Sequence, residues 1–169
     1  MKSKPVYTTL TLDPTAKRHL FLTQGLGAEA AHRALAASPY VAACVLTLDD
    51  AVEVQPAVCA ALAKAGLDTA FYVAGSEVFL WRVTGLLRGA GVEQRRIQQE
   101  IIGSLARKVY CVHCRTMNEN VTTTVYPCAH CGMTLTVRDH FSRPLGAYMG
   151  VIVDAESPGD VPEPETLYV

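Results

Sequence analysis

Compact apolar segments alternate with helix-forming segments over the first half of the chain. Three apolar segments lack a polar face and end at glycine or acidic residues, and they predict strands at 19–23, 41–48 and 69–74. Each is followed by a segment of helical composition, and these predict helices at 28–37, 56–65 and 76–88. The alternation predicts a parallel sheet with helices on both faces and right-handed crossover connections.

Two further segments of this region have a weaker pattern. Ile97, Ile101 and Leu105 recur at four-residue spacing, so another helix is predicted at 93–105. Residues 6–10 form an alternating patch that is expected to be an edge strand. Together these elements predict a small three-layer α/β domain spanning 1–106.

The pattern changes after residue 106. Residues 107–153 are β-rich and carry four of the six cysteines, which predicts a second domain built as a metal-binding ribbon. From Asp154 onward there are five acidic residues, three prolines and no Lys or Arg. That composition predicts an extended or mobile tail at 154–169.

Composition and charge restrict the class of protein. Half of the 169 residues are apolar and the formal net charge is -1, so a strongly basic nucleic-acid-binding protein is not indicated. The N-terminal segment lacks the apolar stretch of a signal peptide, and no run is long enough to cross a bilayer. We therefore expect a soluble, cytoplasmic protein, in which reducing conditions favour cysteines as metal ligands over disulfides.

Two C-x-x-C units, Cys111–Cys114 and Cys128–Cys131, are separated by 13 residues. The two residues inside each unit let the chain turn tightly, so that both sulfur atoms face one ion. N–H groups in the turn can then hydrogen-bond to the thiolates. Two such units on facing hairpins predict one tetrahedral metal site with the ligands Cys111, Cys114, Cys128 and Cys131, a geometry that suits zinc or iron.

The segments around the cysteines support a ribbon. Residues 118–120 are interpreted as a polar hairpin tip, with strands at 121–126 and 133–137. Zinc is the commoner ion in ribbons, whereas iron would give a one-electron carrier as in rubredoxin. Arg115 stands where rubredoxin-type knuckles usually have glycine, which favours zinc.

The remaining histidines and cysteines near these motifs are not expected to be ligands. His113 and His130 lie inside the C-x-x-C units, so they are expected to face outward toward solvent or a partner. Cys44 falls in a predicted strand and Cys59 in a predicted helix, and both are expected to be core residues.

A glycine-rich loop follows the first predicted strand. Residues 25–30 fit the pattern G-x-G-x-x-G/A, and Asp49 or Asp50 ends the next strand where an acid would bind a ribose. This pattern is typical of dinucleotide binding. A tight strand-to-helix turn without a ligand produces the same pattern, so both interpretations stay open.

The third strand carries a more specific resemblance. Residues 71–76, with Gly91-Val92 and residues 97–100, resemble the end of the pyridine-nucleotide domain of ferredoxin-reductase-like flavoenzymes. In those enzymes the strand ends in Cys-Gly-Pro, whereas Ala74 and Ser76 replace the cysteine and the proline here. The resemblance implies a degenerate, non-catalytic relative of that domain, and an ordinary βα unit is the alternative.

The segment around the ribbon is locally basic. From Arg95 to Arg143 there are seven Lys and Arg against three Asp and Glu. This favours a docking surface for an acidic partner, with an ordinary solvated face as the alternative. His140 is a conceivable base, but no nucleophile or paired carboxylate can be identified around it in the sequence.

The order of these motifs resembles a known family. A small α/β domain, the two cysteine units, then Asp139-His140-Phe141-Ser142-Arg143 and residues 145–151 are similar to the DmmA-like small subunit of bacterial dimethylamine monooxygenase. The resemblance implies a haem-bearing oxygenase subunit and an FMN and [2Fe-2S] reductase subunit as partners. Together they oxidise dimethylamine to methylamine and formaldehyde with NADPH and O₂. The four cysteines carry over as the metal site, and no catalytic residue carries over.

Several functions are consistent with the sequence. The first is an accessory electron-transfer subunit of this monooxygenase, and the second is a purely structural zinc-ribbon subunit that holds its partners together. A NAD(P)-binding protein that uses the Gly25 loop is a third. A nucleic-acid-binding zinc ribbon is disfavoured by the acidic tail and the charge, and an independent enzyme is the least supported because a Cys₄ site has no open position.

Overall fold

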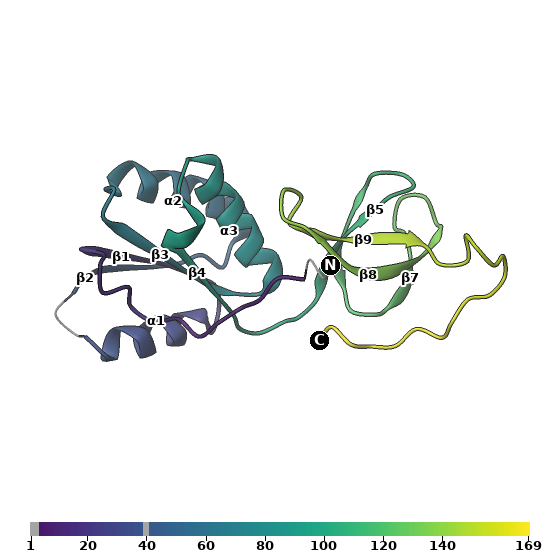
Figure 1. Ribbon diagram of the computed structural model, residues 1–169, viewed down its shortest axis with the longest axis horizontal. Coiled ribbons are helices and arrows are strands. Elements are labelled where there is room, and N and C mark those ends of the chain that lie inside the picture. Colours follow the sequence, from purple (N-terminus) through teal and green to yellow (C-terminus); the bar gives the residue numbers. More distant parts are fainter. Residues whose placement is uncertain (1–3, 39–40) are drawn as a thin grey trace. The chain divides into compact units, whose positions relative to one another are not determined.

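The computed structural model describes residues 4–38 and 41–169 of the chain. Contacts between residues divide the chain into two compact units (Figure 1). We call residues 7–103 the α/β unit, and residues 104–169 together with residues 4–6 the ribbon unit. Residues 154–169, which the sequence predicts as a separate tail, fall within the ribbon unit.

The α/β unit contains one sheet of four parallel strands. Their order across the sheet is β2-β1-β3-β4. Every residue of β3 is buried, as expected for a central strand covered on both faces. The strands are β1 (Arg18–Thr23), β2 (Ala42–Thr47), β3 (Thr69–Gly75) and β4 (Ile97–Ile101).

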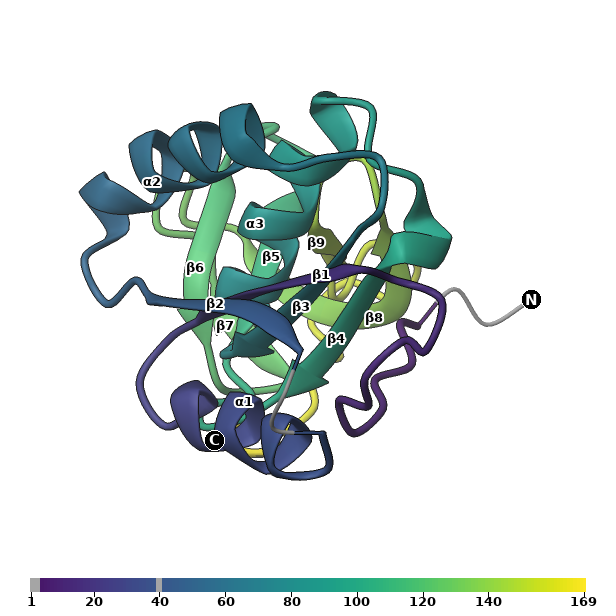
Figure 2. The same ribbon diagram turned by 90° about the vertical axis from the view of Figure 1, so that its left-hand side faces the viewer.

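Three helices cover the two faces of this sheet. Helix α1 (Gly27–Ala36) lies on one face, and α2 (Ala51–Lys64) and α3 (Glu77–Gly89) lie on the other, as Figure 2 shows. Side chains alternate along β1, so Phe21 joins the core beneath α1, whereas Leu20 and Leu22 join the core beneath α2 and α3. The predicted three-layer α/β fold is confirmed.

The helix predicted at 93–105 is wrong. A single 3₁₀ turn, η1 (Gln94–Arg96), leads into β4, which pairs with β3 from Phe71↔Ile97 to Gly75↔Ile101. Four-residue spacing also places two side chains on the same face of a strand, and Ile97 and Ile101 both pack into the core beneath α2 and α3. Pairing with β3 overrides the helical interpretation because the edge of β3 would otherwise keep its backbone groups unpaired.

Helix α2 begins earlier than the sequence predicts. Asp50 is its N-cap, and the Asp50 carboxylate accepts a hydrogen bond of 2.8 Å from the Val52 N–H. Pro56, predicted as the first helical residue, lies inside the helix. The helix extends past the proline because Val54 and Val58, four residues apart, are both buried against the sheet.

The N-terminal segment runs along β4 without forming a regular strand. The edge strand predicted at 6–10 is therefore wrong, since none of these residues has strand structure. The Thr8 N–H donates to the Gln99 carbonyl at 3.2 Å, and the Leu10 N–H donates to Glu100 Oε2 at 2.7 Å. With the bond from the Thr11 N–H to Gln98 Oε1 at 3.0 Å, one backbone bond and two bonds to side chains fix the segment at the sheet edge, but they do not make a ladder.

A buried histidine lies at the start of β1. His19 is 4% exposed, and its Nδ1 lies 2.8 Å from the Tyr72 hydroxyl, which accepts a hydrogen bond from the Asp13 N–H. The buried ring therefore has a polar partner on one side, and its burial favours the neutral imidazole. Burial lowers the pKa of His19 below its ordinary value of 6.5, against a smaller opposing effect of Asp13.

This histidine predicts a loss of stability in mild acid. Because the unfolded chain takes up the proton near pH 6.5 and the folded chain only at lower pH, the His19 contribution is complete above about pH 6.5 and is lost below it. Urea unfolding between pH 8 and pH 5 should show this fall, and His19→Gln should flatten it. The same substitution at the exposed His32 should leave the slope unchanged. Equal slopes in the wild type and His19→Gln would contradict the assignment.

The ribbon unit contains one five-stranded sheet. The order is β6-β5-β9-β8-β7, and all pairs are antiparallel except β5 and β9. The hairpin tip predicted at 118–120 is wrong, because these residues lie within β6 and the first cysteine unit itself turns the chain. The strands are β5 (Arg107–Cys111), β6 (Met117–Val121), β7 (Val125–Pro127), β8 (Thr134–Ser142) and β9 (Ala147–Ile152).

The acidic C-terminal segment has turns and bends at 154–159, and its end is bound to the ribbon. The Thr124 N–H donates to the Glu165 carbonyl at 2.9 Å, and the Leu167 N–H donates to the Thr122 carbonyl at 3.1 Å. The Arg107 guanidinium lies over the ring of Tyr168 at 3.8 Å, a cation–π contact. These contacts hold the last residues in place.

No helix in the described part of the chain combines the length and the apolar character needed to cross a membrane.

Candidate metal centre

Two turns of the ribbon unit have the same backbone hydrogen bonds. We call residues 111–116 the first knuckle and residues 128–133 the second knuckle. In the first, the Arg115 N–H donates to the Cys111 carbonyl and the Cys111 N–H donates to the Thr116 carbonyl, both at 2.9 Å. In the second, the Gly132 N–H donates to the Cys128 carbonyl and the Cys128 N–H donates to the Met133 carbonyl, again both at 2.9 Å. Each knuckle follows a strand, since Cys111 ends β5 and Cys128 follows β7.

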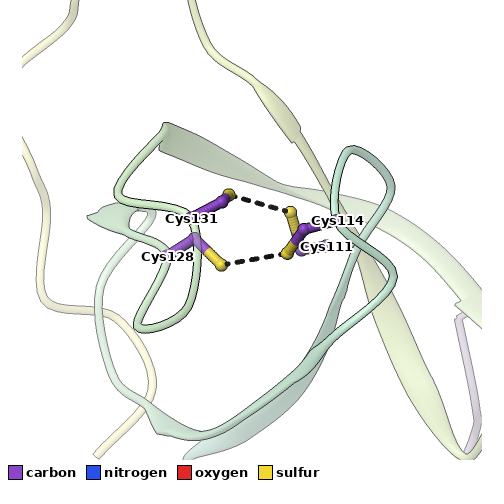
Figure 3. Close-up of side chains that lie close together, drawn as sticks. All are labelled: Cys111, Cys114, Cys128 and Cys131. Atoms are coloured by element: carbon purple, nitrogen blue, oxygen red, sulfur yellow. Dashed lines mark hydrogen bonds between the residues drawn. The ribbon is translucent and has the colours of Figure 1, made fainter.

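The two knuckles bring four sulfur atoms together (Figure 3). The Sγ atoms of Cys111 and Cys131 are 3.9 Å apart, and those of Cys114 and Cys128 are 3.7 Å apart. All four lie within 4.8 Å of one another. A tetrahedral ion with metal–sulfur bonds of about 2.3 Å requires sulfur atoms about 3.8 Å apart, whereas a disulfide requires about 2.05 Å. The four cysteines are therefore positioned to bind a metal ion.

The thiols in this cluster differ in acidity. Burial acts to raise the pKa of Cys128, but the N–H groups of Cys131 and His130 and the side chain of Asn118 lower it to about 6. The Met133 N–H acts to lower the pKa of Cys131, but burial and the neighbouring thiols raise it to about 12. Without a cation the cluster cannot hold four negative charges, so binding of a metal ion would release the remaining protons.

Two buried polar groups beside the cluster fit a metal–thiolate centre. The Tyr126 side chain packs against the cysteines, and within the described residues its hydroxyl has no hydrogen-bond partner. Asn118 Nδ2 is likewise buried without a hydrogen bond of normal geometry, although the Asn118 side chain lies close enough to Cys128 to lower the pKa of that thiol. Asn118 Oδ1 accepts a hydrogen bond from the Ala129 N–H at 2.9 Å. Unpaired buried donors are costly in an apolar core, but they are favourable beside thiolates that can accept their hydrogen bonds.

The sequence pattern does not reveal these two residues as part of the site. It predicts Asn118 within a hairpin tip and Tyr126 as an ordinary strand residue. Asn118 reaches the second knuckle only because β6 pairs with β5 beside the first knuckle. No sequence spacing signals that contact, since it depends on the pairing of two strands.

The other candidate residues lie apart from the sulfur cluster. His113 and His130 are exposed, as expected for residues inside a knuckle. Cys44 and Cys59 are exposed as well, so their assignment to the core is wrong. Cys44 lies in the edge strand β2, and the buried residues of α2 are Val54 and Val58. Among the described residues, the four knuckle cysteines form the one group of His, Cys, Asp or Glu side chains arranged to hold a metal ion.

The glycine loop has a structural cause that does not require a nucleotide. The Gly25 N–H, one of the groups that would face a phosphate, donates to Asp49 Oδ1 at 2.7 Å. A Cβ added to Gly27 would lie 2.3 Å from the Ala74 carbonyl oxygen, so glycine is required where α1 approaches β3. The geometry favours the tight-turn interpretation.

Comparison with known proteins gives the family. The family described as "Dimethylamine monooxygenase subunit DmmA-like, C-terminal domain" matches residues 108–151, which include both knuckles. A relative from Ectopseudomonas mendocina (strain ymp), named "Heme-dependent oxidative N-demethylase delta subunit", is 34% identical over 159 residues, which are 92% of this chain and 91% of the relative. The chain belongs to the DmmA-like family. Membership extends over the α/β unit as well as the ribbon unit, because the match to the relative covers both.

No solved structure matches this DmmA-like chain. The resemblance that the sequence motifs indicate is thus confirmed by a relative along nearly the whole chain.

Proposed function

We propose that this chain is the accessory electron-transfer subunit of a haem-dependent amine monooxygenase, with one iron ion bound by Cys111, Cys114, Cys128 and Cys131. The observation that carries the proposal is the four-sulfur cluster with tetrahedral spacing. It occurs in a chain that matches an oxidative N-demethylase subunit over nearly its whole length. Iron with four thiolate ligands takes up one electron at a time.

The reaction explains why such a carrier is useful. Oxidation of dimethylamine by O₂ and NADPH gives methylamine, formaldehyde and water, so two electrons must reach the oxygenase for each turnover. A haem-bearing oxygenase subunit would supply the oxygen chemistry, and a reductase subunit with FMN and a [2Fe-2S] cluster would take the hydride from NADPH. The present chain would receive single electrons and deliver them, in the cytoplasm.

The chain itself would not bind the amine. Four cysteines fill all four positions of a tetrahedral ion, so none remains for a substrate or for O₂. Its own residues would hold the metal, donate hydrogen bonds to the thiolates and contact the partner subunits.

A structural zinc site is the second candidate. Arg115, at the position where rubredoxin-type knuckles usually have glycine, favours it. Zinc has no redox chemistry, so the subunit would then stabilise the complex only, and electrons would pass directly between its partners.

Rapid mixing of the purified subunits tests the proposal. NADPH and the reductase subunit should reduce the haem of the oxygenase subunit quickly only when the iron form of this chain is present. The zinc-substituted chain is the matched control, because it keeps the fold and removes the redox change. Equal rates of haem reduction with the iron form, the zinc form and no added chain would overturn the electron-transfer role.

A further inference from the structure

The two knuckles differ at one position with an unusual backbone conformation. Arg115 and Gly132 occupy equivalent places, since the N–H of each donates to the carbonyl of the first cysteine of its knuckle. Both have positive φ, 64° for Arg115 and 72° for Gly132. Glycine adopts this left-handed conformation without a steric penalty, whereas a residue with a Cβ is destabilised in it. The first knuckle thus keeps an arginine where glycine would be more stable.

Within the described residues, no side-chain partner of Arg115 offsets this strain. Arg115 is exposed, and no ion pair or side-chain hydrogen bond of its guanidinium occurs within the described residues. A strained and exposed residue at the edge of a functional site indicates a role outside the fold itself. Its free charge is the property that glycine cannot supply.

Arg115 follows Cys114, one of the two cysteines through which solvent reaches the sulfur cluster. Cys114 and Cys131 are partly exposed, whereas Cys111 and Cys128 are buried. We call residues 112–115 and 129–132 the knuckle tip. It contains one arginine, two exposed histidines and the 44% exposed Val112, and it has no Asp or Glu. Apart from the cysteine ligands, a small positive and partly apolar set of side chains therefore flanks the two partly exposed cysteines.

We propose that the knuckle tip is the docking surface for an acidic patch on the haem-bearing oxygenase subunit, with Arg115 as its charged contact. The proposal rests on the function proposed above and adds the surface and the partner. Charge complementarity selects an acidic partner surface, because outside its two cysteine ligands the tip carries one positive and no negative side chain, while the whole chain has a net charge of -1. The relative is haem-dependent by name, so the haem-bearing subunit is the one to which the proposed carrier must deliver electrons, and we take it as the partner. Docking at the tip would bring the haem subunit next to Cys114 and Cys131.

The full-length variant Arg115→Gly separates docking from folding. It should raise the midpoint of denaturant unfolding, because it removes the strain, and should weaken binding to the purified oxygenase subunit. The dissociation constant at low salt should rise about fivefold, as expected for loss of one exposed ion pair, and the difference should shrink at high salt. Isothermal titration calorimetry at two salt concentrations measures both effects, and metal analysis verifies that the ion is retained.

A second arginine provides the matched control. Arg143 is exposed in the turn between β8 and β9, at the end of the hairpin away from the knuckles. Arg143→Gln removes the same charge and should leave the dissociation constant unchanged. Equal weakening in both variants, unchanged binding in Arg115→Gly, or binding of the reductase but not the oxygenase subunit would each overturn the proposal. Binding is measured without turnover, so a chain that docks through Arg115 but does not reduce haem would refute the electron-transfer role and leave this surface in place.

Discussion

Replacing Cys128 with serine is expected to abolish metal binding and to unfold the ribbon locally. Cys128 is buried, and its Sγ lies 3.7 Å from that of Cys114 across the site. Removing one of four ligands should release the ion, and a structural zinc ion contributes about 10–16 kcal/mol to the folding of zinc-finger peptides. We therefore expect the ribbon to lose several kcal/mol of stability. Metal analysis of the purified variant and denaturant unfolding measure the two losses.

An exposed cysteine supplies the control for this experiment. Cys59 lies on the surface of α2, so Cys59→Ser changes the same atom without touching the cluster. Its metal content should stay at one ion per chain, and its free energy of unfolding should change by less than about 0.5 kcal/mol. A Cys128→Ser protein that kept a full equivalent of metal would show that the four sulfur atoms are not the ligands.

Replacing Gly27 with alanine is expected to destabilise the α/β unit strongly. The new Cβ would lie 2.3 Å from the Ala74 carbonyl oxygen and 2.7 Å from its carbon, which are backbone atoms of the central strand β3. Helix α1 must therefore move away from the sheet. Overpacking of this kind costs about 1–3 kcal/mol or more. Thermal and denaturant unfolding of the full-length variant measure the loss.

Gly85→Ala is the matched control for this prediction. Gly85 is an exposed residue in the interior of α3, and an added Cβ would contact nothing within 4 Å. The same change there should stabilise the protein by about 0.8–1 kcal/mol through helix propensity. If Gly27→Ala kept wild-type stability and instead removed saturable binding of NADPH, the glycine loop would be a nucleotide site rather than a packing requirement.

The sequence predicts the parts of the fold that local patterns determine. The strands β1, β2 and β3 are apolar on both faces, and such segments have few alternatives in a small α/β domain. The arrangement of the cysteines is equally local, because each knuckle positions two sulfur atoms within a single turn. Only the meeting of the two knuckles requires the tertiary fold.

The wrong predictions occur where a local pattern fits two structures. The spacing of Ile97 and Ile101 suits one face of a helix and one face of a strand, and pairing with β3 decides between them. Pro56 is favourable at the first turn of a helix, which is why the pattern predicts a start there. The Asp50 cap and the buried Val54 instead place the start of α2 before the proline. The exposure of Cys44 follows from the edge position of β2, which no residue pattern within that strand reveals.

The metal content and visible spectrum of the protein purified from iron-replete cells test the central claim most directly. We predict one iron per chain and a red colour that bleaches on reduction, because the four-sulfur centre is proposed to carry electrons. One zinc per chain and no visible absorption would contradict that role. If a protein refolded with iron were also not reducible by its partners, the subunit would be a scaffold.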